Sequence, residues 1–227
     1  LPALIAGNTV VFKPSEQCPA VGEALIKLFE AAGFPPGVIN LVQGARDTGA
    51  AVLNHPDVDG VLFTGSANTG AYIHKLFGGR PEVILALEMG GNNPLIAWDV
   101  SDADAAASII VQSAFITSGK RCTCARRLTL PAGDRGDAIL SAVKVQMENL
   151  TLGAWDEKET ATIGPLVSAD IAGFVVKKSE ELVDLGANPL VTSRVSQKGS
   201  AFVEPGLYDV TGCGVPDEEI FGPVLQV

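Results

Sequence analysis

Two residues of the sequence have the chemistry of a nucleophile and a base. Cys122 stands in the run Ser-Gly-Lys-Arg-Cys-Thr-Cys at 118–124, where the neighbouring cations Lys120 and Arg121 favour the thiolate, the reactive form of a cysteine. Glu88 follows an apolar run and precedes the glycine-rich stretch Met-Gly-Gly-Asn-Asn-Pro. An apolar setting lets a carboxyl group hold a proton near neutral pH, as a general base must. The pair predicts a thiol nucleophile whose base is a carboxylate.

Other chemistries fit the sequence less well. The two histidines, His55 and His74, lack the spacing of metal ligands and are poorly placed for a serine or cysteine mechanism that needs a histidine. We therefore expect no metal site. Most cysteines are small buried side chains, and Cys124 is interpreted in that way.

A strand–turn–helix junction at 64–70 predicts an anion site. The exposed N–H groups and the helix dipole at such a junction can hold a pyrophosphate. The candidate cofactor residues here are Gly65, Ser66, Ala67, Asn68, Thr69 and Gly70. Ala71 and Tyr72 stand where a nucleotide-triphosphate loop requires Lys and Ser or Thr, which excludes that class. A helix start capped by Ser66, with no ligand, is the alternative.

A second candidate cofactor site is the pair Lys13 and Glu16, directly after a predicted strand. A carboxylate there can accept hydrogen bonds from a ribose diol and repel a 2′-phosphate, which favours NAD over NADP. The alternative is a solvated turn that caps the helix beginning at Pro19.

The elements that position these residues alternate between short strands and helices, as in parallel β-α-β units. We predict strands at 9–12, 38–42, 60–63, 83–87, 126–130 and 223–227 and helices at 19–32, 47–54, 66–79, 134–150 and 168–185. The first of these helices should bury Val21, Ala24, Leu25, Leu28, Phe29 and Ala32. A further helix, capped by Ser101 with Asp104 at its third position, should pack through Ala106, Ile109, Ile110, Ser113 and Ile116.

Composition narrows the class of protein. The chain has 227 residues, 47% of them hydrophobic, and a net charge of −10, which argues against a nucleic-acid or anionic-membrane partner. No apolar run approaches the roughly 20 residues that span a bilayer. Four scattered cysteines suggest reduced thiols, so we expect a soluble, cytoplasmic protein. The first residue is Leu1 and the last residues read as an unfinished strand, which suggests a piece of a longer protein.

Four motifs in order carry a family resemblance. They are Phe-Thr-Gly-Ser at 63–66, Glu-Met-Gly-Gly-Asn-Asn-Pro at 88–94, Gly-Lys-Arg-Cys-Thr at 119–123 and Glu-Glu-Ile-Phe-Gly-Pro at 218–223. The chain resembles the NAD(P)-dependent aldehyde dehydrogenase superfamily over nearly its whole length. The resemblance implies an α/β fold incomplete at both ends, with a Rossmann-type parallel-sheet NAD-binding domain at 1–87 and an α/β catalytic domain at 88–227.

The resemblance also implies roles. Cys122 would attack an aldehyde to give a thiohemiacetal and then a thioester, and Glu88 would activate the water that hydrolyses it. Lys13 and Glu16 would hold the adenosine ribose of NAD, and the stretch from Gly65 to Gly70 would line its phosphates. Glu219 and Phe221 would position the nicotinamide ribose and ring. The substrate would be a succinylated semialdehyde of bacterial arginine catabolism, or a related one such as succinate or glutamate semialdehyde.

Some features depart from the family pattern or leave a choice open. Lys120 replaces the usual Gln, with its side chain directed either toward the thiol or outward. The family's oxyanion asparagine and oligomerisation segment fall outside this sequence, so we expect the parent to be an active homo-oligomer and the isolated piece to be nearly inactive and poorly folded. Arg126 and Arg127 are candidate partners for an anionic substrate, but we expect them to face solvent. A catalytically silent relative is the alternative from another class.

Overall fold

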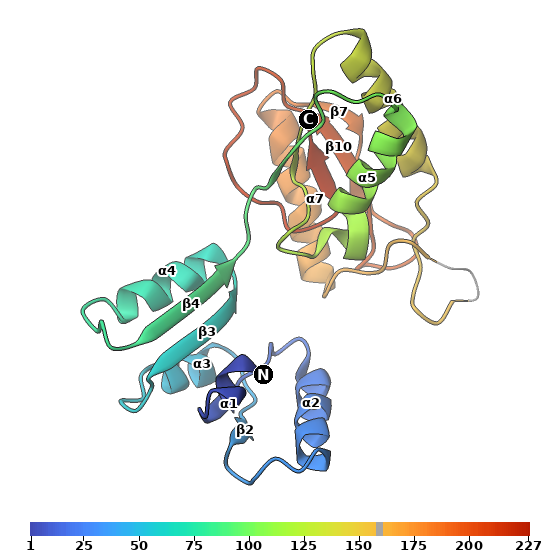
Figure 1. The fold of residues 1–227 in the computed structure, drawn as a ribbon. Coiled ribbons are helices and arrows are strands. Elements are labelled where there is room, and N and C mark those ends of the chain that lie inside the picture. The colour runs from blue at the N-terminus through green and yellow to red at the C-terminus, as the bar shows by residue number, and fades with distance from the viewer. Residues whose placement is uncertain (158–160) are drawn as a thin grey trace. The chain divides into compact units, whose positions relative to one another are not determined.

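The chain forms two compact units. The computed structural model describes residues 1–157 and 161–227, and it divides into Leu1–Met89 and Gly90–Val227 (Figure 1). This division lies two residues beyond the boundary predicted between 87 and 88. The roles of the two parts as NAD-binding and catalytic domains remain predictions.

The first unit alternates helices and parallel strands. Its elements are α1 (Pro2–Ile5), β1 (Val10–Phe12), α2 (Pro19–Ala31), β2 (Ile39–Leu41), α3 (Arg46–Leu53), β3 (Gly60–Gly65), α4 (Ala67–Leu76) and β4 (Ile84–Met89). The strands predicted in this half are confirmed and are parallel, as expected for a Rossmann-type parallel sheet, but they form two pairs instead of a single sheet. Strand β1 pairs with β2 and β3 pairs with β4, each as a separate parallel pair. Hydrophobic periodicity identifies a strand without specifying which neighbour it pairs with, so the sequence did not distinguish the two arrangements.

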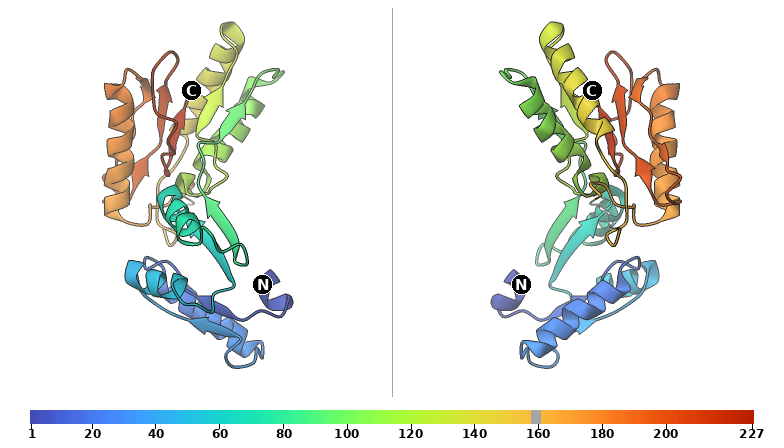
Figure 2. Two further views of the ribbon diagram at one scale, coloured as in Figure 1. Left: turned by 90° about the vertical axis from the view of Figure 1, so that its left-hand side faces the viewer. Right: turned by 90° about the vertical axis from the view of Figure 1, so that its right-hand side faces the viewer.

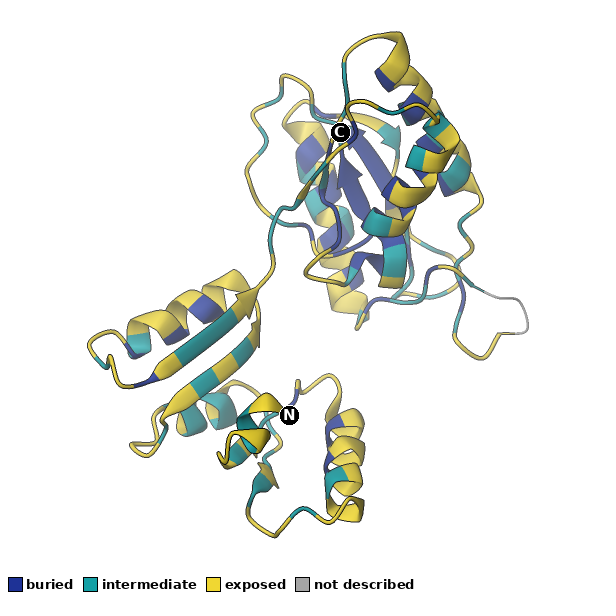
Figure 3. Ribbon diagram, in the orientation of Figure 1, coloured by how far each residue is buried: buried dark blue, intermediate teal, exposed yellow. Residues whose placement is uncertain are grey.

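The predicted buried stripe of α2 is also wrong. Val21 and Leu28 are 69% and 67% exposed, and the buried residues are Gly22 and Ile26 (Figure 3). A side chain at position 22 would meet the Pro14 ring at 2.5 Å, so glycine allows α2 to approach the chain after β1 closely. Val21, Leu25 and Leu28, which the periodicity assigned to the buried face, are all exposed.

The second unit is a sheet between helices. Its elements are β5 (Pro94–Ile96), α5 (Ala103–Phe115), the 3-10 helix η1 (Ile116–Gly119), β6 (Arg127–Thr129), α6 (Asp134–Glu148), α7 (Ala169–Asp184), β7 (Asn188–Val191), β8 (Arg194–Val195), β9 (Val203–Glu204), β10 (Gly206–Asp209) and β11 (Val224–Gln226). The sheet order is β5-β6-β11-β10-β7, parallel except for β7, and β8 pairs with β9 as an antiparallel ribbon. The two strands and the long helices predicted here are confirmed, whereas β5, β7, β8, β9 and β10 were not predicted as individual strands.

Alternate side chains of the central strands fill two cores, one on each face of this sheet. Leu225 packs with Ile110 and Val143 under α5 and α6, whereas Val224 packs with Val175 of α7 on the other side. Figure 2 shows α7 on one side of the strands and α5 and α6 on the other. The sheet therefore fixes the starts of β6 and β11. The cysteine loop, residues 120–126, directly precedes β6, and residues 219–222 come just before β11.

The start of α5 differs from the prediction. Asp102, and not Ser101, caps the helix, because its carboxylate accepts the N–H groups of Asp104 and Ala105, both at 3.0 Å. The buried face is correspondingly displaced by one residue, about 100° around the helix. Ile109 is 65% exposed. The residues that do face the core are Ala107, Ile110, Val111, Ala114 and Phe115.

Candidate active site

Cys122 lies on the loop between η1 and β6 and is an exposed free thiol. Cys124, two residues further, is buried, and its sulfur lies 3.7 Å from the Ile116 carbonyl oxygen. The interpretation of Cys124 as a small buried side chain is confirmed. Of these two cysteines, only Cys122 is accessible to a substrate.

The backbone before Cys122 is strained. Thr117, Ser118 and Gly119 all have positive φ, at 53°, 59° and 66°, a region that non-glycine residues rarely adopt. A Cβ atom at position 119 would collide with the carbonyl of Gly222. Such strain persists where surrounding contacts hold it, and it is concentrated at functional sites.

Two side chains hold this strained turn. The Ser118 hydroxyl donates to the Gly164 carbonyl at 2.7 Å, and the Lys120 ammonium donates to the Pro165 carbonyl at 2.7 Å. The orientation of Lys120, which the sequence left open, is thereby given in part, because its ammonium group connects the cysteine loop to residue 165.

Asn93 fixes the cysteine loop from the glycine-rich run. Its side-chain amide donates to the carbonyl of Cys122 at 2.7 Å and to that of Cys124 at 3.0 Å. Its own carbonyl accepts the N–H groups of Arg126 and Arg127. Sequence reasoning did not identify Asn93, although an amide side chain in a glycine-rich turn after a candidate base was the available signal.

The expectation that Arg126 faces solvent is wrong. Its side chain is 1% exposed, and Nε and Nη2 both donate to Glu219 Oε1 at 3.1 Å. The same guanidinium donates to the carbonyls of Gly222, Gly119 and Arg121. A buried charge needs such partners, and residues distant in sequence supply them here.

Arg126 therefore joins two predicted cofactor residues to the cysteine loop. Glu219 is its ion-pair partner, and the Phe221 ring lies 5.3 Å from its guanidinium carbon. Gly90 leaves room for this arrangement, because a Cβ atom there would collide with the Glu219 carboxylate. In the second unit, Arg126 thus links the cysteine loop to Glu219 by hydrogen bonds and to Phe221 by a ring contact.

Arg127 begins β6 and is also engaged. Its Nε donates to the Asn92 carbonyl at 3.0 Å, and Nη1 lies 3.3 Å from the Asp217 carboxylate. Its side chain is 43% exposed. Neither of the two arginines considered as substrate partners from the sequence has a free guanidinium.

Glu88 belongs to the first unit, near the end of β4. In the β3–β4 register it lies opposite Thr64, with Met89 opposite Gly65. The structure therefore brings the candidate base to the same end of the pair as the predicted phosphate turn. Glu88 is exposed, in contrast to the apolar setting expected for it, because β4 packs through its middle residues while its end extends beyond them.

The turn at 65–70 is a capped helix start. Ser66 Oγ accepts the N–H of Thr69 at 3.3 Å and lies 3.0 Å from the Thr69 hydroxyl oxygen. Gly65, Ser66, Ala67, Asn68 and Thr69 are exposed. Gly70 is buried, and a Cβ atom there would collide with the Met89 side chain. The lack of a side chain at Gly70 thus serves packing.

Lys13 and Glu16 form an ion pair of 3.7 Å after β1. The Lys13 ammonium also donates to the carbonyls of Pro14 and Gly44, at 2.8 and 2.9 Å. No hydrogen bond joins this pair to the Gly65 turn in the described part of the chain. The two predicted cofactor stretches follow strands of different parallel pairs.

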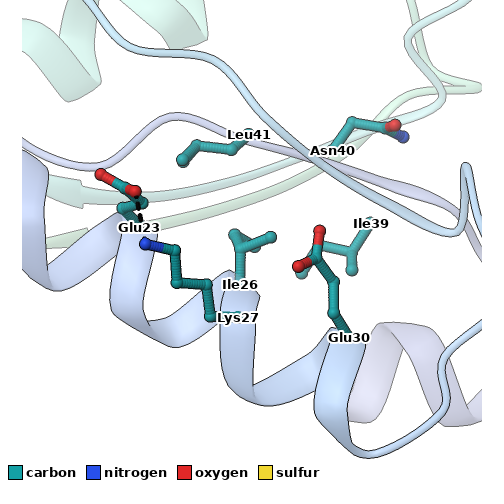
Figure 4. Close-up of a pocket in the computed structure, with 7 residues that line it drawn as sticks. All are labelled: Glu23, Ile26, Lys27, Glu30, Ile39, Asn40 and Leu41. Atoms are coloured by element: carbon teal, nitrogen blue, oxygen red, sulfur yellow. Dashed lines mark ion pairs between the residues drawn. The ribbon is translucent and has the colours of Figure 1, made fainter.

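The described residues form a surface hollow in each unit. One, of about 410 Å³, lies between α2 and β2 and contains the Glu23–Lys27 ion pair, but none of the predicted site residues lines it (Figure 4). The other, of about 270 Å³, lies between α5 and the cysteine loop. Among residues 1–157 and 161–227 there is no group of side chains suited to a metal ion, and no helix long and apolar enough to cross a membrane.

Comparison with known proteins decides the family. The sequence profile of the aldehyde dehydrogenase family matches residues 1–227. The chain belongs to the aldehyde dehydrogenase family. Its relatives include N-succinylglutamate 5-semialdehyde dehydrogenases of Escherichia coli K12 and Shigella flexneri, which are 53% and 52% identical over the whole chain. The chain spans about half the length of these relatives, 46% in both cases.

Solved aldehyde dehydrogenase structures share the fold. A Sinorhizobium meliloti 1021 protein assigned as a methylmalonate-semialdehyde dehydrogenase, solved in complex with NAD, superposes with a TM-score of 0.90 at 27% identity over 100% of this chain and 47% of its own. A variant of the 1-pyrroline-5-carboxylate dehydrogenase of Thermus thermophilus gives 0.87 at 32% identity, over 97% of this chain and 44% of its own. The mixed α/β architecture with parallel strands is therefore that of an aldehyde dehydrogenase.

Proposed function

We propose that the full-length protein oxidises N-succinyl-L-glutamate 5-semialdehyde to N-succinyl-L-glutamate with NAD, in bacterial arginine catabolism by the succinyltransferase pathway. The observation that carries the proposal is the held loop of the second unit, which presents an exposed thiol at Cys122 and is joined through Arg126 to Glu219 and Phe221. The 53% identity to relatives of that name over the whole chain supports the substrate.

In this proposal Cys122 is the nucleophile. Its sulfur bonds to the aldehyde carbon, and the resulting thiohemiacetal is oxidised to a thioester; a covalent intermediate divides one difficult step into two. Asn93 contributes by fixing the loop carbonyls on both sides of the thiol, which limits the motion of the sulfur. Glu88 takes a proton from the water that attacks the thioester, releasing the acid and regenerating the thiol.

The residues present fit NAD. Glu16 and Lys13 offer an acceptor and a donor for a ribose diol, and the Ser66-capped start of α4 has exposed backbone and hydroxyl groups suited to phosphates. Glu219 would accept from the nicotinamide ribose, held in place by Arg126. When bound, NAD supplies the hydride acceptor that the protein's side chains lack.

The test is NADH formation by the full-length protein. N-succinylglutamate semialdehyde is compared with succinate semialdehyde and glutamate semialdehyde, and we expect a strong preference for the succinylated substrate. Activity only on succinate semialdehyde or glutamate semialdehyde would agree with the family assignment but would refute the proposed substrate. The Cys122→Ala variant should lose oxidation while it keeps NAD binding, measured by calorimetry. Cys213→Ala, at another free cysteine, should retain both. Unchanged turnover in Cys122→Ala would instead indicate a different nucleophile.

A further inference from the structure

The hollow beside the cysteine loop is lined by one cation, Arg121. Its lining consists of Ile109, Gln112, Ser113, Ile116, Arg121, Thr123 and Cys124. Arg121 and Thr123 flank Cys122 in the chain, so the hollow lies against the loop that carries the candidate nucleophile, although Cys122 itself is not among the lining residues. Among the residues that the structure describes, the Arg121 guanidinium has no ion pair and no hydrogen bond. Only the backbone carbonyl of Arg121 is engaged, by Arg126 and by the N–H of Cys124.

The other cations of the loop are committed elsewhere. Lys120 donates to the Pro165 carbonyl, Arg126 is buried against Glu219, and Arg127 pairs with Asp217. No acidic residue lines the hollow. In a chain with a net charge of −10, this leaves Arg121 as the cation available to a negatively charged ligand at this position.

The remaining lining matches a ligand with an anionic group and a polar backbone. Gln112, Ser113 and Thr123 offer amide and hydroxyl side chains that make no hydrogen bond within the described chain, whereas Ile109 and Ile116 offer apolar surface. A guanidinium binds a carboxylate through two parallel N–H groups, which makes arginine a strong and directional receptor for that group.

We propose that Arg121 binds a carboxylate of the substrate and thereby selects carboxylate-bearing aldehydes; this inference rests on the proposed function. N-succinylglutamate 5-semialdehyde carries an α-carboxylate and a succinyl carboxylate in addition to its aldehyde. A cation on the residue next to the nucleophile can hold either carboxylate while the aldehyde faces the thiol, because consecutive Cα atoms are only about 3.8 Å apart. Arg121 is then a specificity-determining residue and not a source of chemistry.

The first measurement is a selectivity ratio on the full-length protein. Arg121→Gln should lower kcat/KM for N-succinylglutamate semialdehyde about 10- to 100-fold more than for hexanal, a neutral aldehyde, as expected for one charge-assisted contact. Arg121→Lys should retain part of the selectivity, since it keeps the charge and loses the paired geometry. Arg135→Gln, which removes an exposed arginine that does not line the hollow, should leave the ratio unchanged. Equal losses on both aldehydes would overturn the proposal.

A substrate that lacks the succinyl carboxylate tells which group is bound. With N-acetylglutamate semialdehyde, an effect of Arg121→Gln that persists assigns the α-carboxylate, and one that vanishes assigns the succinyl carboxylate.

A second readout separates this inference from the proposed function. Alkylation of Cys122, followed by peptide mass spectrometry, needs no aldehyde oxidation. We expect the wild type to react with iodoacetate in preference to iodoacetamide, relative to free cysteine, and Arg121→Gln to lose that preference. An unchanged ratio in Arg121→Gln would contradict carboxylate recognition even if the enzyme oxidises the succinylated substrate. If Arg121→Gln loses the preference for iodoacetate but the wild type oxidises no semialdehyde, the anion site is supported and the proposed function is refuted.

Discussion

Replacing Arg126 by Met should cost more stability than any exchange of an exposed charge in this chain. The side chains of Arg126 and Glu219 are 1% and 16% exposed, and the guanidinium makes five hydrogen bonds in the structure. Removing one partner of a buried pair leaves the other charge uncompensated, which typically costs about 3–5 kcal/mol. The three carbonyls released by the change add to this loss, since buried acceptors then lack a donor.

The Arg194–Glu204 pair is the matched control. Its Nε–Oε2 distance, 2.6 Å, is shorter than that of the buried pair, but Arg194 is 73% exposed. Exposed pairs contribute about 0–1 kcal/mol, so Arg194→Met should change stability little. The comparison tests whether burial, and not distance, sets the strength of an ion pair.

The assay is urea denaturation of the full-length protein, with the free energy of unfolding compared between variants. In a double-mutant cycle, Arg126→Met with Glu219→Met should cost less than the sum of the single changes, because the double variant leaves no isolated buried charge. A loss in Arg126→Met no larger than that in Arg194→Met, or simple additivity in the cycle, would refute the reasoning.

Three further predictions concern the loop, the cofactor and an exposed helix. Gly119→Ala should destabilise the protein by about 1–3 kcal/mol more than Gly212→Ala. Both glycines have positive φ, but only at position 119 would an added Cβ atom collide with a carbonyl group. Equal shifts of the melting temperature in the two variants would contradict this prediction. Glu16→Gln should raise the ratio of kcat/KM with NADP to kcat/KM with NAD about fivefold, because removing one charge repulsion in a solvated site is worth about 1 kcal/mol. A wild-type protein that is equally efficient with both cofactors would contradict the role assigned to Glu16. In α2, the Lys27 ammonium hydrogen-bonded to Glu23 holds the pKa of that carboxyl below its usual value. This pair therefore stabilises the fold at pH values above the usual carboxyl pKa, and its contribution is lost as the pH falls through the lowered pKa. Lys27→Met should raise the Glu23 pKa again in an NMR titration, and an unchanged pKa would show that another group lowers it.

Local sequence signals predicted local structure well. Ser66 caps α4, as one of the two interpretations of the 64–70 junction expected, and alternation of strand and helix residues located most of the longer elements. Local signals depend on neighbours within one or two turns, which the sequence displays directly. They failed where a decision between adjacent residues was needed, as with Ser101 and Asp102.

The sequence did not predict contacts between residues that lie far apart in the chain. We expected the Arg126 side chain to face solvent, because its partner, Glu219, lies 93 residues further along the chain and no local pattern indicates the pair. We predicted that the apolar stripe of α2 is buried, because periodicity shows which face of a helix is hydrophobic. Periodicity does not show which element covers that face. The role of Asn93 depends likewise on carbonyls 29 and 31 residues away.

In the proposed mechanism, Cys122 forms a thioester that Glu88 helps to hydrolyse. The most direct measurement is mass spectrometry of the full-length protein, acid-quenched during turnover of N-succinylglutamate semialdehyde with NAD. We expect an N-succinylglutamyl adduct on the peptide that carries Cys122, at low occupancy in the wild type and accumulating in Glu88→Gln together with a burst of NADH. An adduct on another residue, or turnover with no adduct in either protein, would contradict the account.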